Sequence, residues 1–361
     1  MSKNIKDLMS KLKKVYKAKK RDDDIVGTGA NILPPTFYIK APKPLQRLMG
    51  CHFPGRRIIQ VSGRPNSGKT STAMEAIREA QKGYFDQDKK YVESEDVIVI
   101  FVDTEKKFNI NRAIRMGIDP DRLMKIDAGT IEEAAFGIEQ SLELIFSEKP
   151  KAKVLVIIDS VGNTPSAQEA DKNIDETTQL ALSPKAIKRM LRVINTRYMS
   201  KKDVCMLLIN TSYANIGSVG QVNSGGSGME YQSSIIIQLT RIGDILVTRA
   251  GEKYVKGIKA KATLTKNHNQ VADMSLKYIQ FEIEADGIKS LDSFNIKNGN
   301  SFTSGEDKII IDKFNTKKDE VTYVLNGTAY NCTKAEIITI LENDNYEEVI
   351  KEGDSEEWLR I

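Results

Sequence analysis

The chain has 361 residues, with 54 lysines and arginines against 49 aspartates and glutamates, and its formal net charge is +5. This length suffices for one large domain with smaller appendages, and so weak a net charge does not by itself indicate a nucleic-acid partner. Three scattered cysteines and two histidines argue against a disulfide framework or a histidine metal site, while a charged N-terminus and the absence of a long apolar run predict a cytoplasmic protein without a membrane segment.

Residues 1–45 are predicted to form a basic helix and a linker. Apolar residues recur every three or four positions between residues 3 and 20 among many lysines, and then glycines and prolines break the pattern. Because this apolar stripe has no core of its own, we predict an arm that docks onto a neighbouring subunit. A basic tail that binds DNA is the alternative.

The most specific motif comes next. Residues 58–61 are mostly apolar, residues 63–70 read Gly-Arg-Pro-Asn-Ser-Gly-Lys-Thr, and a helical pattern follows. A strand, a glycine-rich turn and a helix N-terminus in this order direct backbone amides toward one anion. We therefore predict a nucleotide site in which Lys69 binds the β- and γ-phosphates and the Thr70 hydroxyl binds Mg²⁺. The predicted binding residues are Gly63, Arg64, Pro65, Asn66, Ser67, Gly68, Lys69, Thr70 and Ser71.

From residue 56 onward, apolar strands alternate with helices. Strands are predicted at 56–62, 97–103, 123–128, 154–160, 204–210 and 234–241, and helices at about 70–84, 109–116, 131–147 and 185–199. This alternation predicts an α/β fold with a doubly wound, mostly parallel sheet. Segments 259–266 and 277–285 predict an antiparallel extension.

Two acidic residues lie at or just beyond the ends of predicted strands, at the sheet edge where ligands of doubly wound folds bind. Glu105 comes just after strand 97–103, where a carboxylate can orient the attacking water. An ordinary surface glutamate is the alternative. Asp159 follows a run of apolar residues, and downstream of a phosphate loop such an acid holds Mg²⁺ beside the loop threonine.

Two segments at this edge are predicted to be loops. Residues 215–228 contain five glycines and no aromatic residue, which predicts a mobile functional loop, with a disordered insertion as the alternative. Residues 162–183 form the other loop and precede a basic stripe at helical spacing. Such a stripe suits a phosphate backbone, although a solvated helix face explains it too. The stripe consists of Lys185, Lys188, Arg189 and Arg192.

Residues 291–361 are predicted to form a small α+β domain with an acidic tail. Segments 309–311 and 321–325 are strand-like, Asn326–Gly327 is a hairpin turn signal, and residues 334–341 are helix-like.

Taken in order, these motifs resemble the RecA family of homologous-recombination ATPases over about residues 45–290. The motifs are Pro54–Arg56, the phosphate loop, Phe101–Glu105, Met116–Leu123, Ile158–Ser160, Leu208–Asn210, Gly225–Gly226 and Thr265–Asn267. Within the family, the bacteriophage UvsX recombinases look most similar, particularly over residues 188–201 and 205–213.

The resemblance implies a RecA-like core at residues 46–290 that hydrolyses ATP with Mg²⁺, forms a helical filament on single-stranded DNA and exchanges strands with a homologous duplex. Glu105 would be the catalytic carboxylate, Asp159 the Walker-B acid, and Lys266 a lysine that reaches the neighbouring subunit's γ-phosphate. Residues 162–183 and 215–228 would be the DNA-binding loops, and the second contains Asn215, Gly225 and Gly226. A single-strand binding protein and a loader are implied as partners, and a bacterial host cytoplasm as the location if a bacteriophage encodes the chain.

Three positions depart from the bacterial members. Arg112 stands where they stack a tyrosine on adenine, and nearby Phe108 is the alternative base-stacking residue. Thr211 replaces a glutamine that senses the γ-phosphate, and His268 replaces a second lysine. Two other functions stay open at this point: a hexameric replicative helicase, and a filament scaffold that uses ATP only as an assembly switch.

Overall fold

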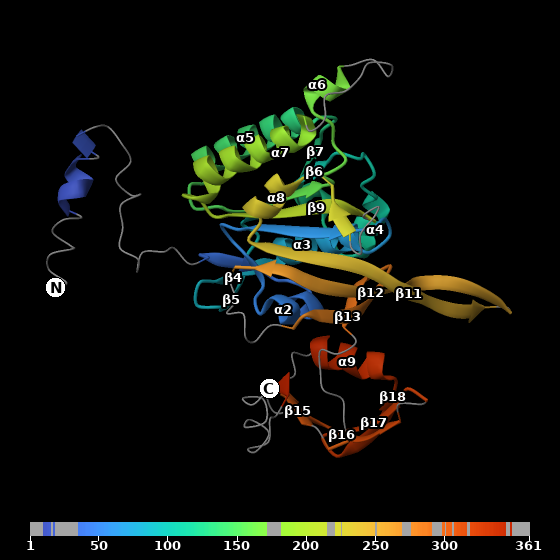
Figure 1. Cartoon of the computed structure of the whole chain (residues 1–361). Coiled ribbons are helices and arrows are strands. Elements are labelled where there is room, and N and C mark those ends of the chain that lie inside the picture. Colours follow the sequence, from blue (N-terminus) through green and yellow to red (C-terminus); the bar gives the residue numbers. More distant parts are fainter. Residues whose placement is uncertain are drawn as a thin grey trace.

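The computed structural model describes residues 10–15, 17–18, 35–171, 182–214, 221–224, 226–249, 251–268, 276–290, 298–299, 301–304, 307–315, 318–343 and 347–348. Within the predicted N-terminal helix, residues 10–15 and 17–18 are helical. Figure 1 shows an α/β body with a smaller C-terminal sheet beside it. Among the described helices, none is both long and apolar enough to cross a membrane.

The central sheet confirms the predicted fold class. Its order is β14-β13-β12-β11-β3-β9-β8-β6-β7, with β10 paired to β9. The strands from β11 to β7 in this order pair in parallel, and β12, β13 and β14 extend the sheet antiparallel. The strand bounds are β3 (Ile58–Gly63), β6 (Val97–Asp103), β7 (Leu123–Asp127), β8 (Lys153–Asp159), β9 (Val204–Ala214), β10 (Gln221–Asn223), β11 (Ile235–Arg249), β12 (Glu252–Asn267), β13 (Tyr278–Glu284) and β14 (Gly287–Ser290).

Helices cover both faces of this sheet. They are α2 (Lys43–Met49), α3 (Lys69–Lys82), α4 (Ile110–Arg115), α5 (Ile131–Glu148), α6 (Ala167–Ala170), α7 (Leu182–Ile194), which continues as a π-helical turn, and α8 (Ser227–Gln232). Figure 1 shows α5 and α7 along one face. In β8, Leu155 and Ile157 pack into the core with α3, while Val154 and Val156 pack into the core with α5 and α7. Burial on both faces explains the nearly continuous apolar strands.

A second, four-stranded sheet packs near α3 and has the order β2-β1-β4-β5. It consists of β1 (Phe37–Ile39), β2 (Phe53–Pro54), β4 (Gly83–Asp86) and β5 (Tyr91–Glu93). The sequence did not predict these strands, because runs of two to four residues are too short to show a periodic pattern.

The hairpin of β11 and β12 is much longer than predicted. Its strands have 15 and 16 residues, whereas the apolar pattern indicated only 234–241 and 259–266. Figure 1 shows the far half of this hairpin projecting beyond the body. The extra residues are held by antiparallel pairing, from Asp244 opposite Ile258 to Arg249 opposite Glu252, and none of them is fully buried. Hydrophobic patterning cannot detect pairing of that kind.

The predicted loop at 215–228 is wrong in part. Gln221–Asn223 forms β10, and α8 begins at Ser227, while 215–220 and Gly225 lie outside the described residues. Gly226 has φ 73°, and a Cβ placed on it would lie 3.2 Å from the Pro184 side chain. A Cβ on Gly228 would lie 3.2 Å from the Lys188 side chain. Two of the glycines therefore let α8 pack closely against α7.

The predicted loop at 162–183 also contains a helix. Ser166 and Glu169 form a capping box that begins the single turn α6. Residues 172–181 of this segment lie outside the described residues.

The C-terminal sheet has the order β18-β17-β16-β15-β19. Its elements are β15 (Ser301–Ser304), β16 (Asp307–Asn315), β17 (Glu320–Leu325), β18 (Thr328–Cys332), β19 (Glu347–Glu348) and the helix α9 (Lys334–Asn343). Asn326 and Gly327 have φ of 48° and 90°, and so they form the predicted tight turn. Phe302, Ile311 and Leu341 belong to a separate apolar cluster. The predicted limits at residues 45 and 290 stay predictions.

Candidate active site

The phosphate loop connects β3 to α3 and depends on two glycines. A Cβ on Gly63 would overlap the Ser67 hydroxyl and crowd the Leu239 carbonyl. Gly68 has φ 98°, and a Cβ there would overlap the Ile283 side chain. Only glycine fits at these positions, so the motif spacing has a direct steric cause.

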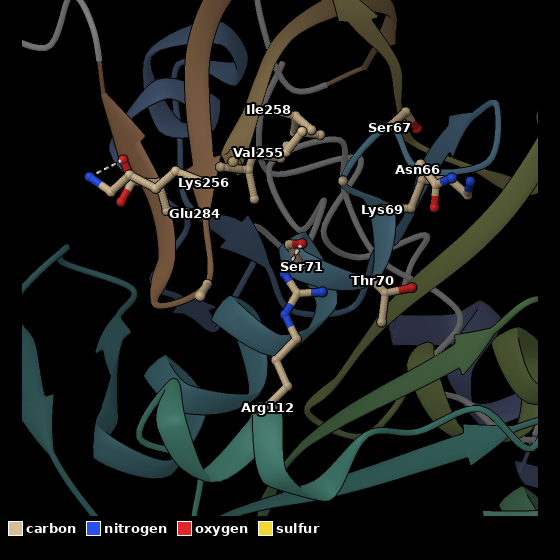
Figure 2. A pocket seen from close by; sticks show the side chains of 14 residues that line it. Asn66, Ser67, Lys69, Thr70, Ser71, Arg112, Val255, Lys256, Ile258 and Glu284 are labelled. Atoms are coloured by element: carbon tan, nitrogen blue, oxygen red, sulfur yellow. Dashed lines mark hydrogen bonds and ion pairs between the residues drawn. The ribbon is translucent and has the colours of Figure 1, made fainter. Parts of the chain in front are cut away.

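A cavity of about 350 Å³ adjoins this loop. Asn66–Ser71 and Arg112 line it, together with residues of β12 and β13. Figure 2 shows Arg112 reaching toward Ser71, with Val255 and Ile258 across the cavity. The Ser67 hydroxyl is buried and has no hydrogen-bond partner among the described residues. An orphan donor beside a helix N-terminus fits an anionic ligand such as a nucleotide phosphate.

Lys69 supplies the cation of this loop. Its Nζ donates a hydrogen bond to the Arg64 carbonyl at 2.9 Å. Burial lowers the pKa of Lys69, and the carboxylates of Asp159 and Glu105 oppose that change. The lysine is therefore half-withdrawn from water and close to both acidic groups.

Thr70 and Asp159 meet at the start of α3 and the end of β8. The Thr70 hydroxyl donates to Asp159 Oδ2 at 2.8 Å. A hydroxyl and a carboxylate are the oxygen ligands that Mg²⁺ accepts when substrate phosphates and waters complete its shell. Among the described residues, no cluster of three or more acidic, histidine or cysteine ligands occurs.

Glu105 lies at the same edge, because β6 and β8 are adjacent and Asp103 pairs with Asp159. Its carboxylate accepts hydrogen bonds from Lys107 Nζ at 3.0 Å, Ser160 Oγ at 3.0 Å and Asn163 Nδ2 at 3.4 Å. Burial would raise the pKa of Glu105, but these donors outweigh it and hold the pKa below its ordinary value. The group is thus a fixed carboxylate at neutral pH.

The alternatives for base stacking are placed differently. Arg112 lines the cavity, and its Nη2 donates to Ser71 Oγ at 2.7 Å. The Phe108 ring instead packs with its centroid 4.8 Å from that of Phe101. Of these two residues, Arg112 is the one that lines the cavity, and its contact with a base stays a prediction.

Lys266 is not among the residues that line the cavity of its own chain. Its Nζ donates to the carbonyls of Glu230 at 2.7 Å and Tyr231 at 3.4 Å, in the last turn of α8. A cation at this end complements the helix dipole. Its contact with a neighbouring subunit's nucleotide stays a prediction.

The basic stripe lies on the exposed face of α7, opposite its buried face of Ile187, Met190, Leu191 and Ile194. Lys185 and Arg189 also line a second cavity of about 530 Å³ between α5 and α7. Lys188 lies beside Gly228 instead. The stripe therefore spans two surroundings, and its role in DNA binding stays a prediction, as do those of Asn215, Gly225 and Gly226.

Sequence reasoning missed several residues near Glu105. Asn163 contacts Glu105, which follows β6, and both Thr211 and Tyr213 near the end of β9. On β12 and β13, Ile258 and Ile283 line the main cavity. Neither an isolated amide nor an aliphatic strand residue carries a motif, so only the fold reveals them.

Comparison with known proteins identifies the family. The model of the RecA N-terminal domain matches residues 45–287, which is more than half of the chain. Protein RecA of Wolinella succinogenes is 26% identical over 220 residues, covering 60% of this chain and 56% of that protein. Protein RecA of Mycoplasma pneumoniae is 28% identical over 218 residues, covering 60% and 58%. The chain thus matches little more than half the length of these relatives. With the phosphate loop, Glu105, Asp159 and Lys266 all inside the matched region, the chain belongs to the RecA family.

Proposed function

We propose that this chain is a DNA-dependent ATPase that forms a helical filament on single-stranded DNA and catalyses homologous pairing and strand exchange. The observation that carries the proposal is the meeting of three elements at one sheet edge. They are the phosphate loop, the Thr70–Asp159 pair and the hydrogen-bonded carboxylate of Glu105. Family membership adds the link from ATP to DNA.

The proposed chemistry is in-line attack of water on the γ-phosphate of ATP. Loop amides and Lys69 bind the phosphates and stabilise the charge that develops on them. Mg²⁺, held by Thr70 and Asp159, would supply further charge neutralisation. Glu105 accepts a hydrogen bond from the attacking water and orients it, which requires the ionised form that its donors favour.

Assembly and DNA binding belong to the same proposal. Lys266 completes the site of a neighbouring subunit, and residues 1–20 dock onto that neighbour. The loops at 162–183 and 215–228, with the α7 stripe, contact single- and double-stranded DNA. We further propose a UvsX-type recombinase, with a single-strand binding protein and a loader as partners and a bacterial host cytoplasm as its location.

The decisive experiment measures ATP hydrolysis with and without single-stranded DNA, for the wild type and for Glu105→Gln. We expect DNA-stimulated turnover in the wild type, and a loss on the order of 10²-fold in the variant with ATP binding retained. Glu148→Gln, at the exposed end of α5, is the control.

Strand exchange and fork unwinding are then assayed side by side, because exchange without unwinding separates a recombinase from a replicative helicase. A wild type that binds ATP but hydrolyses none with DNA would indicate the scaffold instead. Near-normal turnover of Glu105→Gln would remove Glu105 from the mechanism.

A further inference from the structure

Asn163 lies between the proposed catalytic carboxylate and the end of β9. Its Nδ2 donates to Glu105 Oε1 at 3.4 Å and to Thr211 Oγ1 at 3.2 Å. Its Oδ1 accepts from the Tyr213 hydroxyl at 2.8 Å. One amide group therefore uses both donor hydrogens and its acceptor on three separate partners.

The same strand end is tied to β10 and to Ser224, which follows β10. Tyr213 and Ser212 pair with Val222 and Asn223 of β10. Next along the chain, Ser224 accepts a hydrogen bond from Asn210 Nδ2 at 2.9 Å through its carbonyl. Any displacement of this segment therefore acts directly on the end of β9.

A second set of contacts joins this segment to the residue before Asn163. Ser224 Oγ donates to the Gly162 carbonyl at 2.6 Å. A Cβ on Gly162 would overlap the Asn210 side chain, so the backbone here is closely packed. Close packing of this kind transmits small movements between segments rather than absorbing them.

The Tyr213 hydroxyl and the Glu105 carboxylate favour the same orientation of the Asn163 amide. With the Tyr213 hydroxyl donating to Oδ1, the NH₂ group faces the carboxylate of Glu105, where it can donate. A flipped amide would place its oxygen against the carboxylate, which is repulsive, and without the Tyr213 hydroxyl the Asn163 side chain loses one of the contacts that hold it. Tyr213 is 53% exposed, so its ring is accessible to a ligand.

We propose that Asn163 is a positioning residue that couples DNA binding at the 215–228 segment to the orientation of Glu105, with Tyr213 as the contact that receives the signal. This inference rests on the proposed function, in which Glu105 orients the attacking water. In this arrangement the Thr211 hydroxyl accepts a hydrogen bond from Asn163. Because Ser160 and Lys107 also hold Glu105, loss of Asn163 reduces DNA-stimulated turnover by a larger factor than DNA-independent turnover.

The test compares steady-state ATP turnover with and without single-stranded DNA in Asn163→Ala, Tyr213→Phe and the double variant. Tyr213→Phe removes one oxygen atom and keeps the ring. Tyr278→Phe on β13 is the matched control, since Tyr278 is also 53% exposed. We expect Asn163→Ala and Tyr213→Phe each to lower the DNA-stimulated kcat by about tenfold, within the usual range of coupling between sites.

Three further readouts distinguish a positioning role of Asn163 from a merely structural one. The KM for ATP and the affinity of Asn163→Ala for single-stranded DNA with an ATP analogue should stay within about twofold to threefold of wild type, and the DNA-stimulated kcat should fall by a larger factor than the DNA-independent kcat. The double variant should be no slower than Asn163→Ala, because both changes act through one contact.

The coupling through Asn163 would be overturned if the losses of DNA-stimulated kcat were additive in the double variant. It would also be overturned if Tyr213→Phe had the same DNA-stimulated kcat as Tyr278→Phe. If Glu105→Gln is inactive but Asn163→Ala and Tyr213→Phe both show normal DNA stimulation, the coupling through Asn163 is ruled out and the proposed role of Glu105 stands. Near-normal turnover of Glu105→Gln would rule out the proposed role of Glu105 and, with it, the coupling through Asn163.

Discussion

The Thr70 hydroxyl donates a hydrogen bond to Asp159 Oδ2 across 2.8 Å, which joins the start of α3 to the end of β8. Burial raises the pKa of Asp159 to about 6, although the hydrogen bond from Thr70 and the charge of Lys69 oppose that change. The ionised Asp159 carboxylate has therefore lost hydration through burial, and a bound cation would offset that loss.

This loss of hydration predicts that Asp159→Asn stabilises the protein in the absence of nucleotide. The folded pKa lies above the ordinary value of 3.8, so the folded state binds more protons and loses stability as pH rises from about 4 to about 6. At 1.36 kcal/mol for each pH unit, the cost above pH 6 is on the order of 3 kcal/mol. Asparagine carries no charge and still accepts from Thr70. Calorimetry from pH 4 to pH 8 should show the variant more stable at pH 8 and equal near pH 4.

Asp88→Asn, in an exposed turn, is the control for that experiment. Asp159→Asn should also lose the extra thermal protection that Mg²⁺ gives to the ATP-bound wild type. If the stability difference between the variant and the wild type were the same at every pH, the buried Asp159 charge would not be the cause of the lost stability.

Lys69→Ala should weaken ATP binding by about 10- to 100-fold, because hydrogen bonds to charged groups contribute about 1.5–3 kcal/mol. Titration with a fluorescent ATP analogue measures the loss. Electron microscopy with single-stranded DNA should show no nucleotide-dependent filament extension. Lys151→Ala, in an exposed turn before β8, controls for the lost charge. Wild-type affinity in Lys69→Ala would mean that the loop does not bind the β- and γ-phosphates.

Mixing two inactive variants tests whether Lys266 acts across subunits. Lys266→Ala should reduce DNA-stimulated hydrolysis more than ATP binding by the free chain, because Lys266 does not line its own cavity. Glu105→Gln damages the other side of a shared site, so mixed filaments should contain some intact sites and recover activity. If every mixing ratio stays as inactive as the separate variants, an inter-subunit site is ruled out.

The sequence predicted the parts of this site that depend on local chain geometry. Gly63 and Gly68 are required by steric contacts at a strand–helix turn, and the apolar run before Asp159 reflects burial on both faces of β8. Glu105 and Asp159 could be placed together because parallel strands end at one edge.

Long-range contacts could not be predicted in this way. The Tyr213 hydroxyl reaches Asn163 across 50 positions, and no spacing rule connects two such residues. The glycines near residue 226 indicated a loop, although Gly226 and Gly228 also serve the packing of α8 on α7. Glycine content alone does not distinguish mobility from close approach.

Deleting residues 1–20 should leave a folded chain that binds ATP but forms no long filaments. The reason is that the apolar stripe of this segment has no core of its own in the sequence. Filament length by electron microscopy and the salt dependence of DNA binding distinguish the two interpretations. Normal filaments with a shallower salt dependence would instead identify a DNA-binding tail.

Gly226→Ala should weaken DNA binding while sparing ATP binding. Gly226 precedes α8 at φ 73°, and an added Cβ would lie 3.2 Å from Pro184, so alanine both strains the backbone and pushes α8 away from α7. Gly299→Ala is the matched control, since Gly299 has φ 83° and open space around it. Affinity for single-stranded DNA should fall only in Gly226→Ala. Protease mapping of the wild type completes the test, because cleavage between 215 and 228 that is equally fast with and without DNA and an ATP analogue would remove this segment from the DNA interface.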